Sequence, residues 1–204
     1  MTTSAEAVAT PLTLGPADAG RAVSDAEFAS AEYETPWRYE LVGGKLVVMS
    51  PNSEDHDDAA EPWRDAFVGY KLTHRDRVQK VVSEAWVRAG TGKSRIGDVA
   101  VYLVGERSGQ KRPERVPELV VEVVSPGHES WHRDAVEKRS EYHALGVSEY
   151  VLVDYTGGRV LVLTHAPGDY QERTLTVNDS YTTPLLPGLV IRLEQVLRRA
   201  DSQD

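Results

Sequence analysis

The stretch Leu119-Val120-Val121-Glu122-Val123-Val124 decides the fold class, because it reads as a short apolar β-strand interrupted by one carboxylate. Short apolar runs rich in β-branched residues are typical of central strands in a sheet. An ionised carboxylate in such a strand is costly unless a cation, a set of donors or a water-filled cleft accompanies it. Glu122 is therefore the first candidate for a functional group.

A second acid occurs upstream in the same setting. Asp98 follows Ile96-Gly97 and precedes the run Val99-Ala100-Val101-Tyr102-Leu103, which is also typical of a strand. Two acids on neighbouring strands suggest one divalent-metal site, with the backbone carbonyl of Val123 as a third candidate ligand. The residues alone leave another interpretation open, in which Asp98 lies at the surface and Glu122 pairs with an arginine.

Composition indicates one globular domain with a sizeable core. The chain has 204 residues, of which 40% are hydrophobic and 27% charged, and its lack of cysteine excludes disulfides and thiolate metal sites. Neither a membrane-spanning stretch nor a secretory signal is evident, so a cytoplasmic protein is expected. The net charge of -9 argues mildly against nucleic-acid binding, although basic residues cluster within residues 71–80 and 107–115.

The order of predicted elements indicates an α/β fold with a mixed sheet flanked by helices. Residues 1–24 are expected to form a mobile tail, and residues 25–200 the domain. Ser24 and Glu27 form a capping-box pattern that predicts a helix from Asp25, and Gly43-Gly44 predicts a tight β-hairpin. Further predicted elements are a helix over 53–72, which Pro62 kinks or divides, strands over 78–87, 96–104 and 118–124, a helix over 132–145, a hairpin over 149–164, a strand over 170–177, and a short strand and helix over 189–197.

Lys138 is the candidate cation for the acidic pair. It lies on the predicted helix after the Glu122 strand, where Asp134, Lys138 and either Glu141 or Tyr142 share one face. A cation there would position a water molecule and offset developing charge. The alternative is a solvent-exposed Asp134–Lys138 pair of little energetic consequence.

Several motifs, taken in order, resemble a known group of nucleases. They are Arg38-Tyr39-Glu40-Leu41 with the glycine hairpin, Met49-Ser50-Pro51 with His56, Gly97-Asp98-Val99-Ala100-Val101, Glu118 to Pro126 around Glu122, Asp134 with Glu137-Lys138, Gly146 to Asp154, and Leu185-Leu186-Pro187-Gly188-Leu189. From about Trp37 to Leu197, the chain resembles the PD-(D/E)XK nuclease superfamily, and more closely the Uma-two family of restriction-endonuclease-like proteins.

The resemblance implies a restriction-endonuclease-like mixed β-sheet core with Mg²⁺ or Mn²⁺ held by Asp98 and Glu122. It implies that Glu40 is an additional acid facing the site, so that Glu40, Asp98, Glu122 and Lys138 form the catalytic set. The expected function is a divalent-metal-dependent endonuclease that hydrolyses phosphodiester bonds in nucleic acid, DNA in particular. Restriction-type cores often act as twofold dimers, so a homodimer is also expected.

Two positions depart from the superfamily pattern. Gly97 stands where the superfamily usually has proline, which would loosen a turn but leave the Asp98 carboxylate intact. Val124 stands where the standard motif has lysine. In the Uma-two family this lysine is moved to the following helix, where Lys138 lies. The catalytic interpretation therefore depends on whether Lys138 points toward the acids.

Two other functions and one further residue stay open. The segment His128-Glu129-Ser130-Trp131-His132 matches the H-E-x-x-H zinc motif of metalloproteases, although Pro126-Gly127 precedes it and only His143 offers a third ligand. A non-catalytic nucleic-acid-binding or structural module on the same fold is the other alternative. His56 is open as a general base, a phosphate contact or a surface histidine at a helix end.

Overall fold

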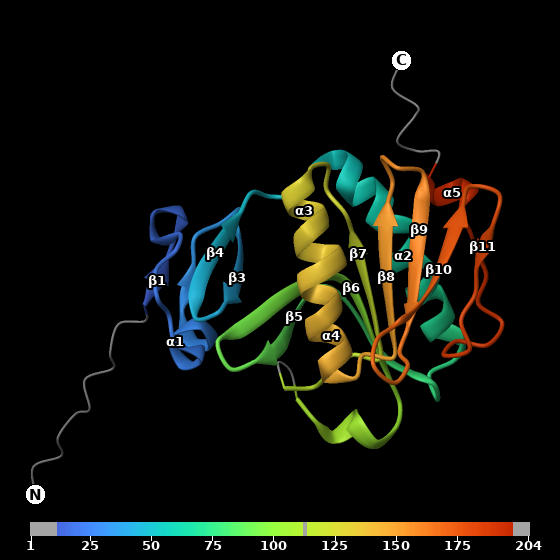
Figure 1. The fold of residues 1–204 in the computed structure, drawn as a ribbon. Coiled ribbons are helices and arrows are strands. Elements are labelled where there is room, and N and C mark those ends of the chain that lie inside the picture. The colour runs from blue at the N-terminus through green and yellow to red at the C-terminus, as the bar shows by residue number, and fades with distance from the viewer. Residues whose placement is uncertain (1–11, 112–113, 198–204) are drawn as a thin grey trace, which may run out of the picture. The chain divides into compact units, whose positions relative to one another are not determined.

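The computed structural model describes residues 12–111 and 114–197, and these form two compact units (Figure 1). The hairpin unit consists of the chain up to Pro51 together with Gly90–Ser94. The core unit consists of Asn52–Ala89 and the chain from Arg95 onward. Whether residues 25–200 behave as one domain stays a prediction.

The hairpin unit begins with ordered structure inside the segment expected to be a tail. Strand β1 (Thr13–Leu14) pairs in parallel with β2 (Glu32–Tyr33), and the 3₁₀ helix η1 (Pro16–Asp18) follows β1. Leu14 is fully buried. Residues 13–24 thus contain secondary structure and buried apolar side chains, because β1 pairs with a strand later in the chain. A mobile tail over residues 1–24 stays a prediction, and residues 1–11 lie outside the described part of the chain.

Helix α1 (Asp25–Ser30) confirms the capping-box prediction. The Glu27 amide donates to Ser24 Oγ over 3.2 Å, and the Ser24 amide donates to Glu27 Oε2 over 2.8 Å. These two bonds satisfy backbone donors that a helix start leaves unpaired, which is why a helix begins here.

Strands β3 (Arg38–Val42) and β4 (Lys45–Met49) form the predicted hairpin. Gly43 and Gly44 have φ angles of 59° and 74°, the left-handed values that a primed two-residue turn requires. Within the same unit, Leu41 of β3 pairs with Ser94, near the start of strand β6 (Lys93–Leu103).

The core unit is built on a mixed sheet with strand order β10-β9-β8-β7-β6, and β5 pairs with β6. Its β7–β8 pair is parallel, whereas β6–β7, β8–β9 and β9–β10 are antiparallel. The strands are β5 (Val78–Gly90), β6 (Lys93–Leu103), β7 (Leu119–Val123), β8 (Glu149–Asp154), β9 (Arg159–Thr164) and β10 (Gln171–Thr176). The mixed sheet flanked by helices confirms the predicted fold class.

Helices cover both faces of this sheet (Figure 1). Helix α2 (Glu54–Thr73) lies on one face. On the other face, α3 (His128–His132), the π-helical stretch η3 (Arg133–Lys138) and α4 (Arg139–Leu145) run without a break as one helical segment. That segment begins four residues before the predicted start, and α2 continues through Pro62 as a single helix.

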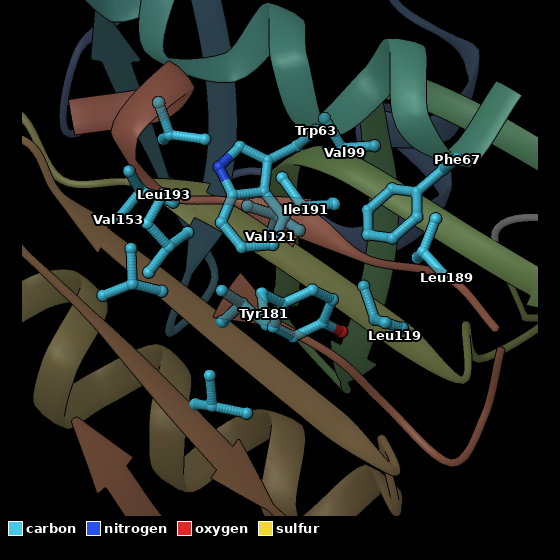
Figure 2. Close-up of a cluster of buried hydrophobic side chains, with 14 of the residues drawn as sticks. Trp63, Phe67, Val99, Leu119, Val121, Val153, Tyr181, Leu189, Ile191 and Leu193 are labelled. Atoms are coloured by element: carbon cyan, nitrogen blue, oxygen red, sulfur yellow. The ribbon is translucent and has the colours of Figure 1, made fainter. Parts of the chain in front are cut away.

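The apolar core under α2 is built from alternate residues of the central strands. Figure 2 shows Trp63 and Phe67 of α2 packed over β7 and β6. Because side chains of a strand alternate between faces, Leu119, Val121 and Val123 join this cluster, and the intervening Val120 joins the cluster under α4.

The C-terminal part of the core unit packs into the apolar cluster under α2. Strands β11 (Ser180–Tyr181) and β12 (Ile191–Arg192) pair with each other, and α5 (Glu194–Leu197) follows. A short 3₁₀ helix, η2 (Glu106–Gly109), lies in the loop between β6 and β7. None of the helices in the described part of the chain combines the length and apolar character that a membrane-spanning segment requires.

Candidate active site

The two acids of the predicted metal site lie where β6 and β7 cease to pair. Backbone pairing runs from Val101↔Leu119 to Val99↔Val121, and beyond it the Val123 amide donates to Asp98 Oδ2 over 2.8 Å. The carboxylate of Asp98 thus replaces a backbone acceptor. Because the N–H and C=O of one strand residue point to the same edge, the Val123 carbonyl also faces this side of β7.

Lys138 is directed at Glu122. Its ammonium Nζ lies 3.0 Å from Glu122 Oε1, 2.8 Å from the Ile96 carbonyl oxygen and 3.5 Å from Asp134 Oδ1. Lys138 and Asp134 are only 2% and 1% exposed. The alternative of a solvent-exposed Asp134–Lys138 pair is therefore wrong, and the geometry has the lysine pointing inward as the nuclease interpretation requires. Its catalytic role stays a prediction.

Tyrosine hydroxyls complete the polar layer around these charges. Tyr142 donates to Glu122 Oε1 over 3.2 Å, and Tyr150 donates to the Asp134 carbonyl over 3.0 Å. Burial, and then the negative charges of Glu122 and Asp134, raises the pKa of Tyr150 well above its ordinary value. Tyr150 therefore remains a hydroxyl donor throughout the neutral range.

The helical segment over these groups has a π-helical turn at the lysine. Residues Arg133–Lys138 adopt this wider conformation, which is rare and often found at functional sites. Arg133 binds the Asp134 carboxylate through two nitrogens, with distances of 3.0 and 3.1 Å. Asp134 thereby links a cation near the surface with the buried amine of Lys138.

Arg95, near the start of β6, forms ion pairs with two acids of the same helical segment. Its guanidinium makes two bonds to Glu141, 2.7 and 3.1 Å long, and one to Glu137 of 3.0 Å. Arg95 is 1% exposed and precedes Ile96, whose carbonyl accepts from Lys138. Arg95 was not among the residues predicted from the sequence, although a charged residue directly before the apolar Asp98 strand is a visible signal.

Gly97 leaves room for the packing beside Glu122. A Cβ atom at this position would lie 2.9 Å from Val120 Cγ1, 3.8 Å from Glu122 Oε1 and 3.9 Å from the Tyr142 hydroxyl. Gly97 lies within β6, so the idea that it loosens a turn is wrong. The contact with Val120 explains why a larger residue is absent there.

His56 is buried against Asp98. It is 3% exposed, and its Nε2 lies 3.2 Å from Asp98 Oδ2. The open interpretation as a surface histidine is therefore wrong, and His56 belongs to the surroundings of the acidic pair.

Glu40 belongs to the hairpin unit. It lies on β3 opposite Val47 and is fully buried. Its assignment as the additional acid of the site stays a prediction.

The H-E-x-x-H segment forms a helical turn at the surface. His128 begins α3, and its ring stacks on that of His132 with centroids 6.4 Å apart. His143, the only third ligand offered, lies on α4 with Nε2 2.8 Å from the Ala166 carbonyl. Within residues 12–111 and 114–197, no three His, Asp or Glu side chains form a group that could hold a metal ion.

Comparison with solved structures gives the following matches. A crystal structure of "a putative nuclease belonging to DUF820" from Anabaena variabilis ATCC 29413 matches with a TM-score of 0.69 and 14% sequence identity, over 86% of this chain and 97% of that one. The type IIG restriction endonuclease BpuSI matches with a TM-score of 0.39 and 13% identity, over 71% of this chain and 15% of that one. No curated protein matches this sequence.

The first of these likenesses, at this low identity, shows the fold alone, which is restriction-endonuclease-like. The family comes from the sequence itself. Residues 25–194 match the family model Uma2, so this chain belongs to the Uma2 family, which is described as "Putative restriction endonuclease".

Proposed function

We propose that this protein is a divalent-metal-dependent endonuclease that hydrolyses phosphodiester bonds in nucleic acid, with DNA as its substrate. The observation that carries the proposal is the buried contact of 3.0 Å between Lys138 Nζ and Glu122 Oε1. This contact supplies a lysine to the acids from the following helix, although Val124 occupies the position where the superfamily has lysine.

The donors available around Asp98 fit a hard divalent cation. Asp98 and Glu122 would hold the ion through carboxylate oxygens, and Val123 through its backbone carbonyl. Mg²⁺ is commonly held by one or two carboxylates together with substrate phosphates, and Mn²⁺ prefers similar ligands. When bound, such an ion would polarise a phosphoryl oxygen and lower the pKa of a water molecule.

The chain's own cation has an electrostatic role in this proposal. Lys138 would offset the charge that develops on the phosphate and orient the attacking water. Its contacts with Glu122, Asp134 and the Ile96 carbonyl support the first role most directly, because they fix the ammonium in place before substrate arrives. Glu40 is proposed as the additional acid, either for a second ion or for holding Lys138.

A cleavage assay with matched variants tests this function. Full-length protein would be incubated with plasmid DNA, single-stranded DNA and RNA, each with Mg²⁺ or Mn²⁺. We expect DNA cleavage that requires the metal, and a fall of at least about 100-fold in Asp98→Asn, Glu122→Gln and Lys138→Met. Unchanged cleavage in Asp98→Asn and Glu122→Gln would remove the mechanism.

Glu129→Gln is the matched control, since it removes an acid of the same helical segment and the central acid of the H-E-x-x-H motif. The endonuclease proposal expects unchanged cleavage by this variant. Zinc in the purified protein, with peptide hydrolysis lost in Glu129→Gln, would instead favour the metalloprotease alternative.

The assembly and location of the enzyme belong to the same proposal. A twofold homodimer would bring one site to each strand of a duplex. Light scattering of the purified protein, with and without duplex DNA, measures the number of subunits. A cytoplasmic location stays a prediction.

A further inference from the structure

The buried face of α2 begins with a polar side chain. His56 leads a stripe whose other members are Ala59, Trp63, Phe67 and Tyr70, and all five side chains are buried. Helical spacing places these residues on the face that packs against the sheet. A histidine at an otherwise apolar position must find a polar partner, because an unsatisfied buried group destabilises the fold.

That partner is Asp98. One oxygen, Oδ2, lies 3.2 Å from His56 Nε2 and accepts the Val123 amide over 2.8 Å. The donors come from α2 and β7, whereas Asp98 lies on β6. Two neighbouring elements thus contact one carboxylate oxygen of a third, which restricts the rotation of the Asp98 side chain.

The other ring nitrogen of His56 has a different environment. Nδ1 is buried and has no hydrogen-bond partner within the described residues, and Asp57 Oδ1 is 3.8 Å away, too far for a hydrogen bond. Within the described residues, the polar contact of the imidazole ring is therefore the one between Nε2 and Asp98. The backbone amide of His56 also donates to Ser53 Oγ, 3.3 Å away, which anchors the first turn of α2.

We propose that His56 is a positioning residue, which orients the Asp98 carboxylate for the divalent cation through its Nε2–H group. This inference rests on the proposed function, since it concerns the same ion. Groups that hydrogen-bond to ligating carboxylates orient them, and their removal typically weakens metal binding by about 10- to 100-fold.

Metal affinity, measured apart from catalysis, tests the inference. Mn²⁺ would be titrated by calorimetry into the full chain and into His56→Leu, His56→Gln and Asp98→Asn. His56→Leu keeps an apolar side chain of similar reach without a donor, and we expect about 10- to 100-fold weaker Mn²⁺ binding. His56→Gln restores an N–H donor at comparable reach, and we expect it to recover most of the affinity.

Two controls separate positioning from folding. Asp57→Asn alters the neighbouring exposed residue of the same turn and should bind Mn²⁺ as the unsubstituted chain does. Thermal unfolding of every variant without metal shows whether a loss of affinity follows a loss of structure. Rescue by His56→Gln supports positioning, since a packing role would favour leucine over glutamine.

The outcomes also separate this inference from the proposed function. Unchanged Mn²⁺ affinity in His56→Leu, with binding lost in Asp98→Asn, would overturn the role of His56 and leave the metal site in place. Equal losses in His56→Leu and His56→Gln would likewise overturn it. Absence of Mn²⁺ binding by the unsubstituted chain would overturn both proposals, whereas binding and rescue without nucleic-acid cleavage would overturn only the nuclease.

Discussion

The two faces of the core-unit sheet bury acids in different ways. On the α2 face, Glu149 lies beside an apolar cluster, and Tyr181 and Thr183 donate hydroxyl groups to its carboxylate. On the α4 face, Glu122 receives the ammonium of Lys138 and the hydroxyl of Tyr142. Neutral hydroxyl donors thus surround the acid beside the apolar core, whereas a buried cation is paired with the acid on the α4 face.

The difference arises because alternate side chains of one strand point to opposite faces of the sheet. In β8, Glu149 is on the same face as Val151 and Val153, which join the α2 cluster, and Tyr150 joins the α4 cluster. The α2 face supplies stability through apolar burial (Figure 2), and the α4 face carries the paired charges. We therefore expect substitutions on the two faces to destabilise the protein for different physical reasons.

Trp63→Ala should have the largest effect on stability. Trp63 is fully buried and makes an edge-to-face contact with Tyr181, with ring centroids 4.9 Å apart. The cavity should lower the free energy of unfolding in urea by about 4 kcal/mol. Trp63→Phe should lose much less, because the indole N–H has no hydrogen-bond partner within the described residues. Similar small losses in both variants would contradict the importance of the α2 core.

Lys138→Met should cause the second-largest loss of stability, and the reason is electrostatic. It leaves Glu122 buried without its ammonium partner, which should lower the free energy of unfolding by about 3 kcal/mol. Lys138→Met with Glu122→Leu should recover much of that loss, because both charges are then absent. The double variant should still lack nuclease activity. A double variant less stable than Lys138→Met would show that the pair is not the source of the effect.

Gly97→Ala tests how tightly the α4 face is packed. The new Cβ would meet Val120 Cγ1 at 2.9 Å, and overpacking of this kind should destabilise the protein by about 2 kcal/mol. Val120→Ala removes the opposing methyl groups, so the two substitutions combined should lose less than the sum of the single losses. Additive losses would show that the new Cβ and the methyl groups of Val120 do not clash.

Glu149→Gln should have the smallest effect, and it appears as a change in pH dependence. Burial raises the pKa of Glu149 above its ordinary value of 4.5, so the folded protein favours the protonated form. Its contribution to stability is therefore complete below the unfolded pKa and declines as pH rises through the folded pKa. The difference in the free energy of unfolding between the unsubstituted protein and Glu149→Gln, measured in urea between pH 4 and 8, should therefore shrink as pH rises. A stability difference that grows with pH would indicate a carboxylate stabilised in its charged form.

Local chemistry accounts for the elements that the sequence analysis predicted well. Ser24 and Glu27 cap α1, and Gly43-Gly44 closes the β3–β4 hairpin, because each pattern satisfies its backbone within a few residues. The strand with Glu122 was predicted to within one residue at each end, because an apolar run bounded by turn residues is itself a local signal.

Tertiary contacts account for the differences. Pro62 stays inside α2, where Trp63 and Phe67 pack on the sheet and outweigh the local penalty of proline. The helical segment starts at His128 directly after Pro126-Gly127, two residues that locally indicate a loop. Leu14 is ordered through pairing of β1 with a strand that follows α1, which no local pattern reveals.

The sequence by itself determined which acids lie in apolar strands, which helix carries the lysine, and the family. These properties follow from side-chain alternation, helical periodicity and motif order, all of which are local or linear. Only the tertiary structure decided that Lys138 meets Glu122, that Arg95 binds Glu141, and that His56 holds Asp98. Such partners depend on how each helix settles on the sheet, and that register is set by the packing of many side chains together.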